Sequence, residues 1–115
     1  GSEMCIRDRG LGYGLAYTAP RESRIAVLPI GYGDGFPRAA EGACALINGS
    51  RAPVVGRVCM DQLFVDVTDC GEVRPGDTVT LIGPGLLCEE LAEACGTISN
   101  EILSRLGKRL PRVWL

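Results

Sequence analysis

A tyrosine set among glycines is the first feature of this sequence that could carry chemistry. The stretch IGYGDGFPR, residues 30–38, places Tyr32 between Gly31 and Gly33, with Asp34 next. Glycine has no Cβ, so it lets a backbone turn sharply and approach another surface closely. Two interpretations stay open from these residues: Tyr32 packs in a turn, or its phenol is held out to exchange a proton. A phenol has an unperturbed pKa of about 10, so a catalytic base would need a lower one.

A second candidate lies in VGRVCMDQ, residues 55–62, where Arg57, Asp61 and Gln62 interrupt an otherwise apolar stretch. One interpretation is an edge strand with a polar face, which the composition favours. The other is a strand that lines a polar pocket shared with another surface. The segments GLGYG and GYGDG do not fit the G-x-G-x-x-G spacing, and neither clearly opens a helix, so nucleotide binding is not predicted.

The composition excludes several classes of partner. The chain has 115 residues, 46% of them hydrophobic, which suits one domain with an aliphatic core. Its net charge of −2 comes from interspersed acids and bases, so no nucleic-acid-binding face is predicted. No apolar run approaches the roughly 18 residues that span a bilayer, so no membrane contact by this domain is expected.

Cysteine is the remaining candidate for metal or redox chemistry. The six cysteines lack the C-x(2–4)-C spacing of a zinc knuckle, and the chain contains no histidine. No metal site is therefore predicted. We expect reduced cysteines that serve as small hydrophobic residues, which indicates a cytoplasmic compartment.

Short strands separated by turns are predicted to position these residues. Strands are expected within residues 24–30, 43–47, 52–56, 57–69, 73–83 and 112–115, and helices at 87–96 and 97–109. Asn48-Gly49 indicates a hairpin, because both residues tolerate a positive φ. Gly96 and Gly107 are expected to end the two helices. The fold class is therefore mostly β: a small closed or nearly closed β-barrel-like domain with two short C-terminal helices.

The first residues stand apart from this pattern. Residues 1–10 begin with Gly-Ser, as after cleavage of a tag, and show no usable periodicity. We expect them to be a tag or disordered leader, with the domain itself spanning residues 11–115.

Six segments occur in one order with ordinary spacing: GYGLAYTAP, RIAVLPIGYGDGFPR, INGSRAPVVGRVCMDQ, VTDCGEVRPGDTVTLIG, CEELAEACGTISNEI and KRLPRVWL. Together they closely resemble the C-terminal β-domain of the pyridoxal-phosphate-dependent alanine racemases, from about residue 11 to the end. The most specific of them are GYGDGFPR and APVVGRVCMDQ.

The resemblance implies a role for several residues named above. In this family a head-to-tail homodimer places the β-domain of one subunit over the cofactor in the N-terminal α/β barrel of the other. A tyrosine of the β-domain and the cofactor-bearing lysine are the two bases, and that tyrosine matches Tyr32. Met60 matches the residue whose backbone amide meets the substrate carboxylate. Arg57 and Asp61 match polar residues near the substrate entry.

Two departures from the family pattern affect the expected function. The chain has a single lysine, Lys108, in a segment where a solvated charge is expected, and it lacks the barrel that holds pyridoxal 5'-phosphate. The isolated chain is therefore expected to be inactive. Asn100 stands where alanine racemases usually have a tyrosine that helps to hold the cofactor phosphate. Asparagine there resembles the serine/alanine racemases associated with vancomycin resistance, and it would leave room and a hydrogen bond for serine.

Two functions from different classes follow. The first is the C-terminal domain of an amino-acid racemase, acting on alanine or serine, with Tyr32 supplied across the dimer interface. The alternative is a stand-alone β-barrel interaction module that kept the fold and lost the chemistry. Because the resistance-type racemases carry a membrane domain upstream, the resemblance to them would imply a membrane-anchored parent.

Overall fold

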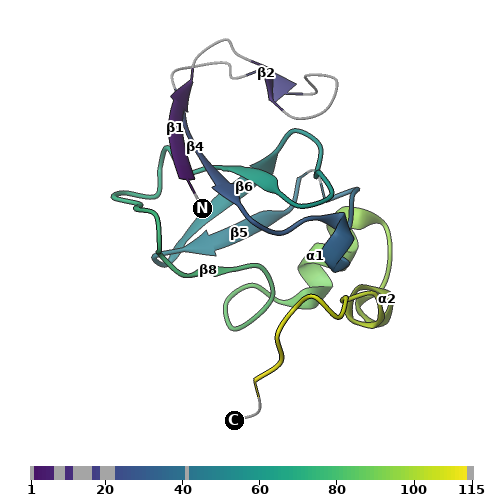
Figure 1. Ribbon diagram of the computed structural model, residues 1–115. Helices are drawn as coiled ribbons and strands as arrows, with labels where there is room; N and C mark the ends of the chain where they lie inside the picture. The colour runs from purple at the N-terminus through teal and green to yellow at the C-terminus, as the bar shows by residue number, and fades with distance from the viewer. Residues whose placement is uncertain (1, 7–9, 12–16, 19–22, 41, 114–115) are drawn as a thin grey trace.

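The computed structural model describes residues 2–6, 10–11, 17–18, 23–40 and 42–113. Within these residues, six strands form one antiparallel sheet in the order β1-β4-β7-β6-β5-β8 (Figure 1). The strands of this sheet are β1 (Ser2–Ile6), β4 (Ser23–Leu28), β5 (Cys44–Ile47), β6 (Ser50–Val55), β7 (Leu63–Asp66) and β8 (Val79–Thr80). A separate two-residue pair joins β2 (Gly10–Leu11) to β3 (Tyr17–Thr18). The predicted mostly-β class is confirmed; the sheet curls as a half-barrel with β1 and β8 at its two ends.

Hairpin β5–β6 forms where the sequence predicts it. Asn48 and Gly49 connect the two strands with φ angles of 51° and 78°. Two successive residues of positive φ match the twist of the flanking strands, which is why Asn-Gly favours this hairpin. Ile47 then pairs with Ser50 directly across the turn.

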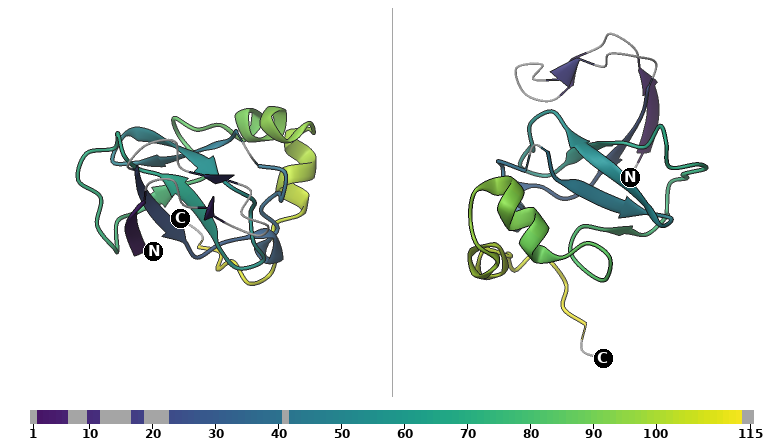
Figure 2. Two further views of the ribbon diagram at one scale, coloured as in Figure 1. Left: turned by 90° about the horizontal axis from the view of Figure 1, so that it is seen from above. Right: turned by 180° about the vertical axis from the view of Figure 1, so that it is seen from behind.

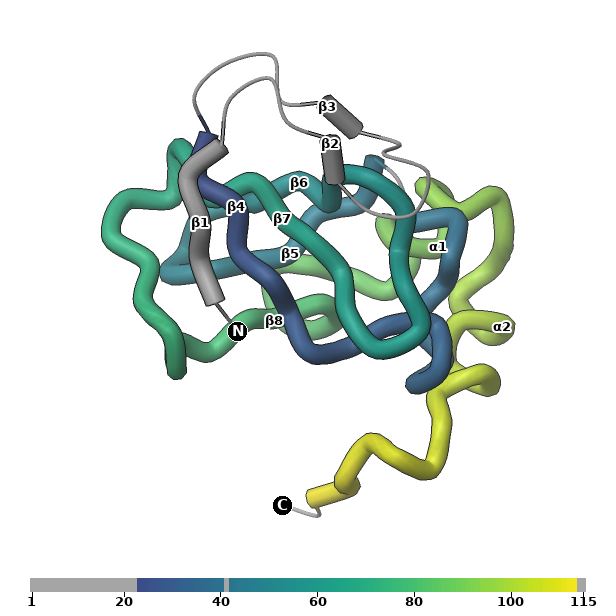
Figure 3. The backbone as a smooth tube through the Cα atoms, turned by 45° about the horizontal axis from the view of Figure 1, so that its top comes forward, coloured from purple at the N-terminus to yellow at the C-terminus, as the bar shows by residue number. Residues whose placement is uncertain are grey.

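The main core lies on one face of the curled sheet. Alternate residues of a strand point to opposite faces, and β4 and β7, which run side by side in Figure 3, each send residues to both. The main cluster includes Leu28, Leu63 and Val65, while Ile25 and Phe64 belong to a smaller cluster. A one-residue slip of either strand would move residues of the main cluster into the place of the smaller one, where side chains of different size are packed.

Two short helices complete the main core at one end of the sheet (Figure 2). They are α1 (Cys88–Cys95) and α2 (Ser99–Ser104), and they bury Leu91 and Ile102 in the main cluster. Gly96 ends α1 with a φ of 71°, as predicted for a glycine after the last helical turn.

The structure corrects several predicted boundaries. Residues 57–62 are not a strand: Gly56 adopts a φ of 70° after β6, and β7 begins only at Leu63. Helix α2 ends at Ser104 rather than at Gly107, whose backbone N–H instead donates to the carbonyl of Asp34 at 2.7 Å. Of the strand expected at residues 112–115, residues 112 and 113 form no strand, and the other two lie outside the described residues.

The first residues also differ from expectation. Residues 2–6, part of the expected leader, form β1 and pair with β4 from Ser2 opposite Val27 to Ile6 opposite Ser23. Their sequence shows no alternation to reveal this, because backbone hydrogen bonds to an adjacent strand need no particular side chains. Among the described helices, none has the length and apolar character needed to cross a membrane.

Candidate active site

Tyr32 is presented to solvent by a rigidly attached turn. It opens η2 (Tyr32–Asp34), a single 3-10 turn that follows β4, and the residue is 41% exposed. The backbone N–H of Tyr32 donates to the carbonyl of Cys59 at 3.0 Å, and that of Gly33 donates to the carbonyl of Met60 at 2.9 Å. The turn that carries the tyrosine is therefore joined, backbone to backbone, to the loop between β6 and β7.

Gly31 is required by this close approach. Its φ of −156° is extended backbone that any residue adopts, so glycine is not needed there for its conformation. A Cβ at this position would lie 2.1 Å from the carbonyl oxygen of Cys59, far inside van der Waals contact. The absence of a side chain therefore allows the two backbones to meet.

Asp34 anchors the turn from within. The residue is only 7% exposed, and its Oδ2 accepts a hydrogen bond from the backbone N–H of Gly31 at 3.1 Å. A buried carboxylate needs a partner that offsets its lost hydration. That partner is Arg109, whose Nε donates to Oδ1 of Asp34 at 2.9 Å.

Arg109 connects the tyrosine turn to the neighbouring loop a second time. Its Nη1 donates to Oδ1 of Asp61 at 2.9 Å, while its Nε remains on Asp34. The hydrogen bond to Asp61, with the charges of both carboxylates, raises the pKa of Arg109 above its ordinary value. The guanidinium, which is always charged in proteins, bridges two acids that belong to different loops.

A surface groove runs beside Tyr32. Arg38 lines the groove on the chain segment that follows Tyr32. Cys95 of α1, Glu101 of α2 and Arg105, which follows α2, also line it. Burial raises the pKa of the Cys95 thiol, so at neutral pH it is a thiol rather than the nucleophilic thiolate. The groove therefore offers Tyr32 and the charged side chains of Arg38, Glu101 and Arg105 to a ligand.

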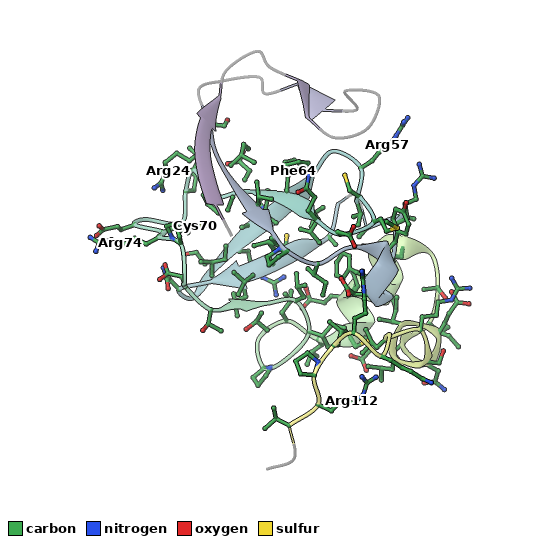
Figure 4. The ribbon with its side chains drawn as sticks, in the orientation of Figure 1. Arg24, Arg57, Phe64, Cys70, Arg74 and Arg112 are labelled. Carbon is green, nitrogen blue, oxygen red and sulfur yellow. The ribbon has the colours of Figure 1, made fainter. Side chains whose placement is uncertain are left out.

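The structure brings some of the predicted site residues together. Met60 is 48% exposed on the loop that Tyr32 and Gly33 contact, and Asp61 follows it. Arg57 lies at the start of the same loop, and Figure 4 shows its side chain reaching away from the sheet. The interpretation of this segment as a strand was wrong, but the segment still forms an exposed polar loop against the tyrosine turn.

Asn100 and Lys108 lie apart from the contacts that hold Tyr32. Asn100 is the second residue of α2 and is exposed, while its neighbours Glu101 and Ile102 line the groove. Lys108 is exposed in the turn after α2. Pyridoxal phosphate is held through a lysine in an enclosed, preorganised site. The residues described here do not supply such a site by themselves.

Sequence reasoning missed Asp34 and Arg109 as site residues. Asp34 is the third residue after Gly31, the spacing at which an acid can reach back to a backbone N–H at the start of a helical turn. That local signal could have identified Asp34. No local signal identifies Arg109, because it contacts Asp34 from 75 positions away.

Comparisons with known proteins agree on one family. A family profile described as "Alanine racemase, C-terminal domain" matches residues 4–114. Alanine racemase of Clostridium kluyveri is 50% identical over 110 residues, which cover 91% of this chain and 28% of that protein. Alanine racemase of Clostridium difficile 630 has a TM-score of 0.95 at 38% identity, covering all of this chain and 31% of that one.

A third relative carries a cofactor. A crystal structure described as alanine racemase from Bartonella henselae with covalently bound pyridoxal phosphate has a TM-score of 0.94 at 36% identity. The match covers 98% of this chain and 32% of that one. This chain thus spans about three tenths of the length of the relatives described here.

Proposed function

This chain belongs to the alanine racemase family, as its C-terminal domain, and we propose that it provides one base of a racemase that interconverts L- and D-alanine. The observation that carries the proposal is the mounting of Tyr32. A half-exposed phenol stands on a turn held by two backbone hydrogen bonds and a buried carboxylate. A side chain that only packed in a turn would need no such anchoring.

Tyr32 is assigned the transfer of a proton at the α-carbon of the amino acid. Racemisation removes a proton from one face of that carbon and returns one to the opposite face, which suits two bases on opposite sides. A positioned acid or base must lie within hydrogen-bond reach of the proton it moves. The exposure of Tyr32 on a fixed turn supports its reaching a substrate held by another domain, with the phenol acting on the L-enantiomer.

The cofactor is assigned to an N-terminal barrel outside these 115 residues. Pyridoxal phosphate, when bound, supplies the electron sink that makes the α-hydrogen of an amino acid acidic. The single lysine here, Lys108, is exposed after α2, so the Schiff-base lysine comes from an N-terminal barrel. The bound cofactor named for the Bartonella henselae relative supports the assignment of pyridoxal phosphate to the complete enzyme.

The loop beside Tyr32 is assigned to the substrate. Met60 would present its backbone amide to the substrate carboxylate, and Arg57 and Asp61 would line the entry. The position of Met60 and Asp61 supports this assignment. Both lie on the loop that the tyrosine turn contacts, through the Gly33 N–H and through Arg109. Asn100 is assigned to substrate preference, with serine as a second substrate.

The assembly proposed is a head-to-tail homodimer in which each β-domain covers the barrel of the other subunit. Exposed large hydrophobic residues support such a covered surface. Tyr32 and Met60 are exposed at neighbouring positions, and Ile98 and Leu103 are exposed on or beside α2. The compartment proposed is the cytoplasm. Five cysteines of the described residues are free, as in a reducing environment.

A chimera tests the proposal. The chain is joined to the N-terminal barrel of the Clostridium difficile alanine racemase, and conversion of alanine is followed in both directions with Tyr32 and with Tyr32→Phe. Loss of the phenolic proton is expected to lower kcat by about 10²–10⁴-fold, with the larger loss from the L side. Denaturation midpoint and dimer mass are measured on both proteins as controls.

The alternative function makes the opposite prediction. A stand-alone interaction module would give a folded, dimeric chimera whose activity is absent or is indifferent to Tyr32. That result would refute the racemase assignment. The match to alanine racemases across 91% of the chain supports the enzyme over the module.

A further inference from the structure

The segment that follows α2 holds the tyrosine turn at three places. The backbone N–H of Gly107 donates to the Asp34 carbonyl at 2.7 Å, and Arg109 binds the Asp34 carboxylate. The third contact is steric: a Cβ on Gly35, whose φ is 95°, would lie 2.0 Å from the carbonyl oxygen of Arg105. Residues 105–109 therefore lie directly against the back of the turn that presents Tyr32.

Arg109 differs from an ordinary surface ion pair. An exposed pair contributes little, because water competes for both charges. Here one partner, Asp34, has a side chain only 10% exposed, so its charge depends on the guanidinium and on the Gly31 N–H. Removing one member of such a pair leaves a buried charge without a partner. The surrounding loop must then move so that water can reach that charge.

The same guanidinium also fixes the separation of two loops. Nε holds Asp34 on the tyrosine turn, and Nη1 holds Asp61 on the loop of Met60. The planar guanidinium presents its donors in a fixed arrangement, which an ammonium cannot reproduce. A Cβ on Gly33 would lie 2.4 Å from Nη2 of Arg109, so the side chain also packs against the backbone next to Tyr32.

We infer that Arg109 is a positioning residue, which sets the place of Tyr32 relative to the Met60–Asp61 loop through Asp34 and Asp61. The expected effect of Arg109 on catalysis rests on the proposed function. Its expected effect on the position of the tyrosine turn rests on the structure alone. Arg109 itself need touch neither substrate nor cofactor. Its removal would misplace the phenol while leaving the sheet and its core intact.

The mechanical consequence is tested on the chain itself by hydrogen exchange. In Arg109→Met the amides of Tyr32 and Gly33, which donate to Cys59 and Met60, are expected to exchange at least about ten-fold faster. Amides of β4 and β7 are expected to keep their rates. Arg51→Met is the matched control, because Arg51 is similarly exposed and forms an ion pair with Glu90, a residue of α1 outside the Tyr32 contacts.

The catalytic consequence is tested in the chimera. Arg109→Met is expected to lower kcat about 10- to 100-fold with a smaller change in KM, since a base misplaced by about 1 Å loses rate more than binding. Arg109→Lys can reach one carboxylate but cannot bridge two in the same geometry, so its kcat is expected between those of the parent and Arg109→Met. Arg51→Met is expected to leave kcat unchanged.

The two tests distinguish a failure of this inference from a failure of the proposed function. Unchanged exchange at Tyr32 and Gly33 in Arg109→Met overturns the inference, whatever the chimera does. Faster exchange combined with an unchanged kcat, in a chimera that depends on Tyr32, also overturns it. If the chimera is indifferent to Tyr32, the proposed function fails, and the exchange rates alone then decide whether Arg109 positions the turn.

Discussion

Nε of Arg109 lies 2.9 Å from Oδ1 of Asp34, although the two residues are 75 positions apart in the chain. Their pairing attaches the C-terminal segment to the turn that begins with Tyr32. Because Arg109 also binds Asp61, three segments distant in sequence meet at one guanidinium. The position of the tyrosine is thus a property of the tertiary structure and not of its glycine-rich motif alone.

Gly31→Ala is predicted to displace the tyrosine turn through a steric clash. The new methyl group would lie 2.1 Å from the Cys59 carbonyl oxygen, so the hydrogen bond from Tyr32 to that carbonyl must lengthen or break. Overpacking of this kind costs about 1–3 kcal/mol of unfolding free energy. Urea denaturation measures the loss, and exchange of the Tyr32 amide reports the displacement.

Gly76→Ala is the control for that substitution. Gly76 has a φ of 96° and nothing within 4 Å of a new Cβ, so alanine there strains the backbone without a clash. We expect a loss of stability, as for alanine forced into a positive φ, with no change in exchange at Tyr32. Equal exchange at Tyr32 in the two variants would contradict the steric account.

The isolated chain with added pyridoxal phosphate is predicted not to racemise alanine. Its one lysine, Lys108, is exposed in a turn and lies in no enclosed site that could hold the cofactor. Formation of D-alanine is followed with D-amino-acid oxidase, and a complete racemase serves as the positive control. Turnover abolished by Lys108→Met would show that the proposed assignment of the cofactor to a separate barrel domain is wrong.

Asn100→Tyr in the chimera is predicted to shift preference from serine toward alanine. The tyrosine would occupy the room, and remove the amide, that the hydroxymethyl group of serine is proposed to use. A site that hydrogen-bonds a substrate hydroxyl discriminates more strongly than one that only accommodates it. The measurement is the ratio of kcat/KM for the two substrates. Asn100→Ala removes the amide without adding a large side chain, so it distinguishes the loss of the hydrogen bond from the loss of space. An unchanged ratio in both variants would show that Asn100 does not determine substrate preference.

The Arg51–Glu90 pair is predicted to make stability depend on pH at acid values. The hydrogen bond from Arg51 lowers the pKa of Glu90 below its ordinary value. A carboxylate with a lowered folded-state pKa stabilises the fold above its unfolded-state pKa, and that contribution disappears as pH falls through the folded-state value. Glu90→Gln is therefore expected to be less stable than the parent at pH 7, by a small amount because the pair is exposed.

Urea denaturation at a series of pH values tests that dependence. The difference between parent and Glu90→Gln is expected to shrink as the pH falls below the ordinary glutamate pKa of about 4.3. Glu93→Gln, on the same helix and also exposed, is the matched control. A difference that persists unchanged at low pH would show that the pair contributes no electrostatic stability.

Features that depend on neighbouring residues could be predicted from the amino-acid sequence. Asn48-Gly49 predicted the hairpin, and Gly96 predicted the end of α1, because a positive φ is a local preference that these residues satisfy. The order of motifs also predicted the family. The glycines around Tyr32 correctly indicated a close backbone approach, although nothing local identified the surface approached.

The residues that lie against the tyrosine turn could not be predicted in this way, because they come from distant parts of the chain. Gly31 and Gly33 are needed because the Cys59 and Met60 carbonyls come from another loop, and the Gly107 N–H, which lies beyond the end of α2, donates to the Asp34 carbonyl. β1 likewise depends on pairing with β4 rather than on its own pattern. Contacts of this kind join residues that are remote in sequence, and they stabilise the protein only once the chain has folded. Local conformational preferences therefore do not predict them.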